Sequence, residues 1–156
     1  MLAIITACQL CSHPARSEVF AGNDALLQIV SLAVEVDDKV TDGCFNNKGS
    51  VVSAAKANLS RSGIVVNQSS RYRIKFGFMG FASRTGGTKI GCDVSSKFFL
   101  YSTVPGLGIV ILAMIDGLYV GPEALDARLS TFAEQFTNEV VTAILQARMA
   151  VSAKSP

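Results

Sequence analysis

The stretch Arg71–Ala82, RYRIKFGFMGFA, alternates between polar and apolar side chains and decides the fold. Tyr72, Ile74 and Phe76 share one side of an extended chain, while the basic residues between them share the other. Alternation with a period of two and a single apolar face predicts a β-strand, in a sheet that is packed on one side and solvated on the other.

The segments after this strand are expected to continue the sheet through two hairpins. A polar loop over residues 83–88 precedes a second strand over residues 89–104, in which apolar side chains again alternate. The run from Phe98 to Ile115 carries no charge and is long enough to suit a membrane span. Because Pro105 to Gly108 have the composition of a turn, we interpret this run as a hairpin of two strands.

Two helices are predicted on either side of these strands. Ser50 can cap a helix that continues to about Ser62, with Gly63 at its C-terminal end. Pro122 suits the first position of a second helix that continues to about Ala150. An apolar stripe at steps of three and four marks this second helix: Leu125, Leu129, Phe132, Phe136, Val140, Ile144 and Leu145.

The remaining apolar segments complete the predicted order of elements. Residues 24–40 are expected to form a strand, with a helical start at Asp24, and residues 64–66 a short strand. We therefore expect an α+β fold, a two-layer sandwich with two helices packed on one face of a mostly antiparallel, four- to five-stranded sheet.

The composition suits a chain with a hydrophobic core. The 156 residues include 14 Lys and Arg against 12 Asp and Glu, a net charge of +2, and 49% of them are hydrophobic. This length supports one domain, and the low share of charged residues excludes a disordered chain. The net charge gives no global reason to expect binding to nucleic acid or to a membrane.

The N-terminal sequence MLAIITACQLC resembles the apolar part of a secretory signal, without the basic residues that normally precede it. Residues 1–21 are therefore interpreted as an incomplete leader, residues 22–150 as one α+β domain and residues 151–156 as a loose tail. Cleavage after Ala21, or lipidation of Cys8 in the lipobox-like sequence ITAC, would place the protein in the periplasm or outside the cell. A lipid on Cys8 would be its only membrane anchor. A buried N-terminal strand or helix is the alternative.

The cysteines support export. Once the leader is cleaved or Cys8 is lipidated, Cys44 and Cys92 remain as the natural internal pair, and we predict a disulfide between them. The CxxC spacing of Cys8 and Cys11 could alternatively indicate a redox motif, but such a motif should lie at the start of a helix in a βαβ unit. A zinc site would need a second pair of ligands, and His13 is the only histidine. We expect no metal and no cofactor.

Catalytic motifs are scarce in this sequence. It contains no GxSxG nucleophile elbow, and His13, the one histidine available as a base, falls within the leader. Glu35 and Asp37 could share a face and act as an acid–base pair, which keeps a small hydrolase as a hypothesis. The alternative is that these carboxylates only solvate the end of a strand and the turn that follows it. We expect no catalytic residues and a protein that is not an enzyme.

Basic residues are concentrated in the middle of the chain, where eight of them lie between positions 56 and 97. A row of them on the open face of the sheet would suit phosphate or carboxylate groups. The alternative is an ordinary solvated face, whose charges prevent aggregation through sheet edges. No nucleic acid is expected as a partner, because the aromatic side chains should point inward. The residues predicted to contact an anionic partner are Arg71, Arg73, Lys75, Lys89 and Lys97.

The segment LSRSGI, residues 59–64, and the order of the surrounding elements resemble small exported envelope domains. Over residues 24–150 the chain is similar in topology to the lipopolysaccharide-assembly lipoprotein family. It resembles more distantly the N-terminal domain of the translocation protein TolB and the auxiliary lipoproteins of ABC transporters. The resemblance implies a non-enzymatic envelope factor that binds an anionic glycolipid or a membrane-protein partner.

These observations favour an exported binding or assembly module of the bacterial cell envelope. The basic row would be its contact surface for an anionic ligand or an envelope protein. A structural subunit that forms homo-oligomers, through a sheet edge or the 105–108 hairpin, is one alternative. The small hydrolase with a carboxylate pair is the other.

Overall fold

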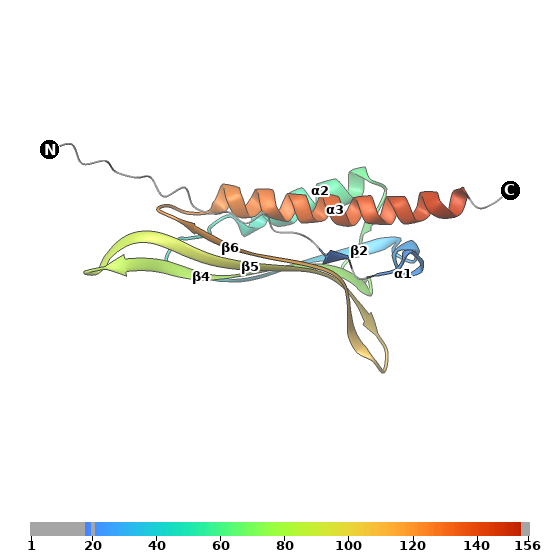
Figure 1. Cartoon of the computed structure of the whole chain (residues 1–156), viewed down its shortest axis with the longest axis horizontal. Helices are drawn as coiled ribbons and strands as arrows, with labels where there is room; N and C mark the ends of the chain where they lie inside the picture. Colours follow the sequence, from blue (N-terminus) through green and yellow to red (C-terminus); the bar gives the residue numbers. More distant parts are fainter. Residues whose placement is uncertain (1–17, 20, 154–156) are drawn as a thin grey trace.

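The computed structural model describes residues 18–19 and 21–153, which form a sheet covered on one face by helices (Figure 1). Helices α2 and α3 lie side by side over this face and contact each other. The predicted two-layer α+β sandwich is confirmed. The elements in chain order are β1 (Glu18–Val19), α1 (Asn23–Leu27), β2 (Ser31–Val40), α2 (Lys48–Arg61), β3 (Val65–Val66), β4 (Tyr72–Thr85), β5 (Thr88–Val104), β6 (Gly108–Gly121) and α3 (Asp126–Ser152).

The strands lie in the order β1-β6-β5-β4-β2-β3. The long strands β4, β5 and β6 form two consecutive antiparallel hairpins, and β1 pairs antiparallel with β6. In contrast, β2 is parallel to both β3 and β4, and α2 provides the crossover that a parallel pair requires. The sheet has six strands instead of four to five, because the two-residue strands β1 and β3 extend its two edges.

The centre of the core is a cluster of phenylalanines between the sheet and α3. Phe98 of β5 is 0% exposed, and its ring centroid lies 4.8 to 6.0 Å from those of four other rings. Phe76 and Phe78 come from β4, while Phe132 and Phe136 come from α3. The alternating strand and the apolar helical stripe recognised in the sequence therefore meet at Phe98.

Cys44 and Cys92 form a disulfide, as predicted. Cys44 lies in the loop between β2 and α2, and Cys92 lies in β5. Both side chains are fully buried. Because β4 separates β2 from β5 in the sheet, the bond ties the loop to a strand that is not its neighbour.

Both long helices begin at residues other than those predicted. The cap of α2 is Asn47, whose side-chain oxygen accepts the backbone N–H of Ser50, the expected cap. Helix α3 begins at Asp126 instead of Pro122. The carboxylate of Asp126 accepts the backbone N–H groups of Asn46 and Asn47, both at 2.8 Å, and this contact positions the start of the helix beside the loop before α2.

The strand predicted over residues 24–40 is shorter than expected. Residues 23–27 form α1, and the extended chain begins only at Ser31. In β5, Ile90 was expected on the same face as Cys92, Val94, Phe98 and Leu100. It is exposed instead, because the register of β4 and β5 shifts between Ser83 and Arg84.

The uncharged run 98–115 forms the end of β5, a turn and the start of β6, so the hairpin interpretation is confirmed. The register of the two strands changes after Leu100, which pairs with Ala113, while Tyr101 pairs with Ile111. The extra residue, Leu112, is a bulge that bends the pair. Beyond it the hairpin leaves the sheet on the side opposite the helices (Figure 1). Within the described residues, no helix is both long and apolar enough to cross a membrane.

Three sequence expectations fall on residues outside the described part of the chain. These are the leader before Glu18, the candidate lipidation site Cys8, and the end of the tail at residues 154–156.

Candidate binding groove on the open sheet face

The sheet face opposite the helices, here called the open face, combines acidic side chains of β2 with basic side chains of β4 and β5. The parallel register of β2 and β4 places Glu35 beside Lys75 and Asp37 beside Gly77. The antiparallel register of β4 and β5 then places Gly77 beside Lys97. Since side chains two residues apart in a strand share a face, these positions all belong to the open face.

Arg73 is neutralised by a carboxylate of β2. Its guanidinium forms a salt bridge with Glu35, which also accepts a hydrogen bond from the Tyr101 hydroxyl at 2.9 Å. Burial acts to raise the pKa of Glu35, but the hydrogen bonds from Tyr101 and Arg73, with the charges of Arg73 and Lys75, outweigh it and lower this pKa. A general acid must hold its proton near neutral pH. This environment therefore disfavours Glu35 as the acid of the hydrolase alternative.

Glu35→Gln is expected to make folding less sensitive to acid. Because the pKa of Glu35 is lower in the folded state than its usual value of 4.5, the carboxylate stabilises the fold above pH 4.5 and loses this effect as the pH falls through the folded pKa. Between pH 7 and 2.5, the wild type should lose roughly 1 kcal/mol more free energy of unfolding than the variant. Urea unfolding at the two pH values measures this difference. Equal losses would show that Arg73 and Tyr101 do not stabilise the ionised form.

Two of the five predicted basic residues lie elsewhere. The guanidinium of Arg71 lies 4.7 Å from the ring centroid of Tyr72 and donates a hydrogen bond to its hydroxyl. Lys89 lies near the start of β5, where its ammonium donates to the carbonyl of Asp42 at 3.0 Å. The predicted residues that share the centre of the open face are Arg73, Lys75 and Lys97.

A groove of about 400 Å³ crosses the open face at Gly77. The glycine leaves room between neighbouring side chains, and a Cβ at this position would lie only 3.1 Å from the backbone carbonyl oxygen of Lys97. A larger residue would therefore fill the groove and crowd β5. The side chains of Met79 and Phe99 contribute an apolar part of the lining. The charged residues of the lining are Asp37, Lys39, Lys75 and Lys97.

The charges around this groove favour an anion. Three lysines and one aspartate give a net charge of +2 from the lining residues. The Asp37 carboxylate lies 3.4 Å from the ammonium of Lys75 and 3.9 Å from that of Lys39, so it pairs with both lysines at the groove. Within residues 21–153, Lys97 forms no ion pair and is exposed. Ammonium groups beside an apolar wall suit a phosphate or carboxylate that is attached to an apolar segment.

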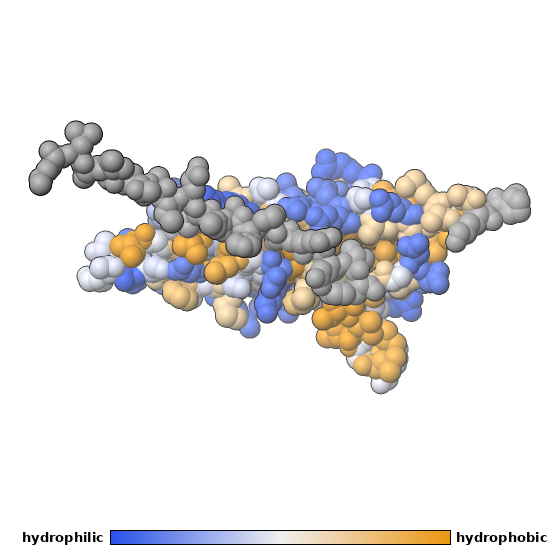
Figure 2. Space-filling model, in the orientation of Figure 1, coloured by the Kyte–Doolittle hydropathy of each residue, from blue (hydrophilic) through white to orange (hydrophobic). Residues whose placement is uncertain are grey.

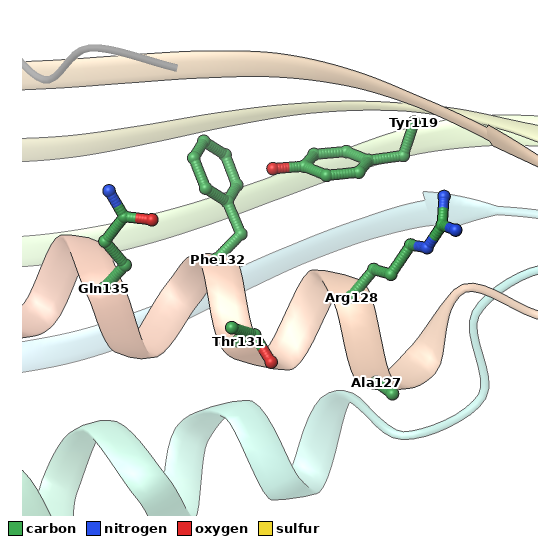
Figure 3. A pocket seen from close by; sticks show the side chains of 6 residues that line it. All are labelled: Tyr119, Ala127, Arg128, Thr131, Phe132 and Gln135. Carbon is green, nitrogen blue, oxygen red and sulfur yellow. The ribbon is translucent and has the colours of Figure 1, made fainter. Parts of the chain in front are cut away.

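A second cavity, of about 340 Å³, lies between β6 and α3 (Figure 3). Its wall is aromatic, with the ring centroids of Tyr119 and Phe132 5.3 Å apart, and Arg128 and Gln135 add polar groups. Burial raises the pKa of Tyr119, so its hydroxyl stays protonated at neutral pH. Arg128 is the single charged group of the lining, so the open-face groove is the stronger candidate for an anion. In the described part of the chain, no three His, Cys, Asp or Glu side chains are grouped to hold a metal ion.

Known proteins resemble this chain in structure. No protein-family profile matches it, and no curated protein matches it in sequence. A point variant of the PelC dodecamer from Paraburkholderia phytofirmans is 19% identical, with a TM-score of 0.48, over 85% of this chain and 98% of that one. A minor lipoprotein from Acinetobacter baumannii is 10% identical, with a TM-score of 0.44, over 73% of this chain and 92% of that one. Rare lipoprotein B from Shewanella oneidensis is 8% identical, with a TM-score of 0.36, over 78% of this chain and 98% of that one.

Two of these three neighbours are named as lipoproteins.

Of the residues that line the groove, only Lys75 and Lys97 were predicted as binding residues. Lys39 reaches it because β2 is parallel to β4, a pairing that follows from the crossover and not from any local pattern. Gly77 could have been recognised in the sequence, since a glycine inside an alternating strand often marks a site where a ligand or another backbone segment approaches the strand closely.

The expected inward direction of the aromatic side chains is wrong for three of them. Phe99 lines the open-face groove, Tyr101 bonds to Glu35, and Phe81 of β4 is 60% exposed. The absence of a nucleic-acid partner stays a prediction, now without support from aromatic orientation.

Proposed function

We propose that this protein is an exported, non-enzymatic binding module of the bacterial cell envelope, whose open-face groove binds an anionic group attached to an apolar segment. An anionic glycolipid has this chemistry. The observation that carries the proposal is the groove at Gly77, where three lysines and one carboxylate lie beside Phe99.

The disulfide supports export. Structural disulfides form and persist in oxidising compartments such as the periplasm, and the buried Cys44–Cys92 bond is part of the core of this chain. The apolar leader expected over residues 1–21 agrees with that compartment.

Different residues of the groove would contact the anionic group and the apolar segment of the ligand. Asp37 pairs with Lys39 and Lys75, while Lys97, which lies opposite Asp116 of β6 but forms no ion pair with a described residue, supplies a further ammonium. A phosphate would accept charge-assisted hydrogen bonds from these groups. The apolar segment of the ligand would pack against Phe99. Arg73, engaged by Glu35, would stay outside the contact.

Lys97→Glu is expected to abolish most of this binding without affecting the fold. The substitution changes the net charge of the lining from +2 to zero and places a carboxylate where the anion binds. Dodecyl phosphate below its micellar concentration is a suitable probe. Titration calorimetry should show affinity for it reduced at least about tenfold. Thermal unfolding should change only slightly, because Lys97 is exposed, although the new carboxylate would lie opposite Asp116 of β6.

Arg61→Glu is the matched control, because it reverses a charge on an exposed residue of α2, away from the open face. It should bind dodecyl phosphate like the wild type. Dodecyl maltoside, which has the same chain and no charge, should bind more weakly than dodecyl phosphate. Equal affinity of Lys97→Glu and the wild type, or equal binding of the two detergents, would contradict the proposed function.

A further inference from the structure

The hairpin beyond the Leu112 bulge is apolar on both of its faces. Ile109 and Ile111 lie on one face of the two-stranded ribbon and Val110 lies on the other, with Leu107 at the tip. Leu107 is 80% exposed and Ile109 66% exposed, and the other two are exposed as well. Figure 2 shows the hairpin as a hydrophobic projection from a body of mixed polarity.

This two-sided pattern indicates what surrounds the hairpin. A ribbon that packs onto another protein buries one face and keeps the other polar. The hairpin from Thr103 to Ile111 instead has no charged residue, and apolar side chains point to both sides. Burying both faces requires a medium that can cover them at once, and the apolar layer of a lipid bilayer is such a medium.

The base of the hairpin has the chemistry of a membrane–water interface. The backbone N–H of Thr103 donates to the carbonyl of Arg71 at 2.9 Å, where the hairpin leaves the sheet. The Arg71 side chain is exposed, stacks over Tyr72 and forms no ion pair with a described residue. Tyr72 itself is buried in the core, so Arg71 is the group at the base of the hairpin that is exposed and charged. An arginine at the boundary between an apolar and a polar region is typical of residues at the level of lipid headgroups. The positive charge of Arg71 complements anionic headgroups.

We infer that the hairpin tip, residues 103–111, inserts into the surface layer of an anionic lipid bilayer. This goes beyond the proposed function and rests on other residues than the groove. From Thr103 to the turn at Gly106 the hairpin is about 10 Å long, at about 3.3 Å per residue, which matches the about 5–10 Å depth of the headgroup–acyl boundary. The backbone N–H of Leu107 donates to the carbonyl of Val104, so part of the hydrogen-bonding capacity of the turn is satisfied within the chain. The backbone N–H and C=O groups on the outer edges of the two strands have no partner strand and need water as a hydrogen-bond partner. These groups therefore keep the hairpin at the bilayer surface.

A single tryptophan tests the insertion directly. The chain contains no Trp, so Leu107→Trp introduces the only one, at an exposed tip where it leaves the fold intact. The full chain should carry Cys8→Ser, so that no lipid can be attached. With vesicles of phosphatidylethanolamine and phosphatidylglycerol, Trp emission should shift to shorter wavelength and be quenched by lipids brominated in the upper acyl chain. Met149→Trp, exposed on α3, should show neither change.

A second pair of variants measures how much the tip contributes. Leu107→Ser with Ile109→Ser should reduce the vesicle partition coefficient by about 100-fold, from the lost burial of two large apolar side chains. Val65→Ser with Met149→Ser removes equally exposed apolar side chains elsewhere and should leave partitioning unchanged. Unshifted, unquenched emission of Leu107→Trp with vesicles would overturn the inference. A shift that needs no vesicles and accompanies a dimer in light scattering would also overturn it, in favour of a contact between two copies.

Discussion

Replacing the disulfide by Cys44→Ala with Cys92→Ala should lower the free energy of unfolding by about 4 kcal/mol. The bond joins residues separated by 48 positions, and it lowers the conformational entropy of the unfolded chain. Its removal increases this entropy and therefore favours unfolding. It also releases the loop before α2 from β5, a strand that is not the neighbour of β2. Both sulfur-bearing side chains are buried, so alanine also leaves small voids.

Urea unfolding of the oxidised wild type, the reduced wild type and the double variant measures this effect. Reduction should add the mass of two hydrogen atoms to the intact protein. It should lower the free energy of unfolding by about as much as the double substitution does. Cys8→Ser with Cys11→Ser is the control, and it should unfold like the wild type. A double Cys44/Cys92 variant as stable as the oxidised wild type would show that the bond does not stabilise the fold.

Phe98→Ala is expected to destabilise the protein by about 4 kcal/mol, the cost of removing a fully buried ring. Phe98 contacts rings from β4 and from α3, so the cavity would lie where the helical layer meets the sheet. Neither layer can close this space without moving a long element. Thermal or urea unfolding of the purified variant measures the loss.

Phe81→Ala provides the matched control for the core truncation. It removes the same side chain from β4, but at a position that is 60% exposed on the open face. Its free energy of unfolding should stay within about 0.5 kcal/mol of the wild type. Similar losses for both variants would contradict the assignment of Phe98 to the centre of the core.

The groove and the hairpin lie on the same side of the molecule. The hairpin turns away from α2 and α3 toward the open face, which also carries the groove at Gly77 (Figure 1). A membrane that received the tip at Leu107 would therefore face the open side of the sheet. This arrangement would bring a lipid-like anion within reach of the lysines, while the helices face away.

Local patterns in the sequence predicted the layers of the fold. The alternation from Arg71 to Ala82 identified the inward and outward faces of β4. The α3 stripe identified its buried face except at Leu145, which is 36% exposed. The disulfide was predictable because only Cys44 and Cys92 lie outside the leader expected over residues 1–21. Each of these features depends on residues close in sequence or on simple counting.

The features that the sequence did not reveal depend on contacts between distant segments. The parallel pairing of β2 with β4 determines that Glu35 neutralises Arg73 and that Asp37 lies at the groove. The start of α3 depends on Asp126 accepting backbone N–H groups from a loop 80 residues earlier. The bend of the hairpin depends on the Leu112 bulge, for which a continuous apolar run gives no local signal.

Mapping of amide chemical shifts in the isotope-labelled protein, during titration with dodecyl phosphate, tests the proposed function most directly. We predict that the largest changes occur at the groove, at Asp37, Gly77 and Lys97, and that Lys97→Glu abolishes them. Changes centred on Tyr119 and Phe132, in the cavity beside α3, would contradict the account. So would a titration that leaves Gly77 and its neighbours unchanged.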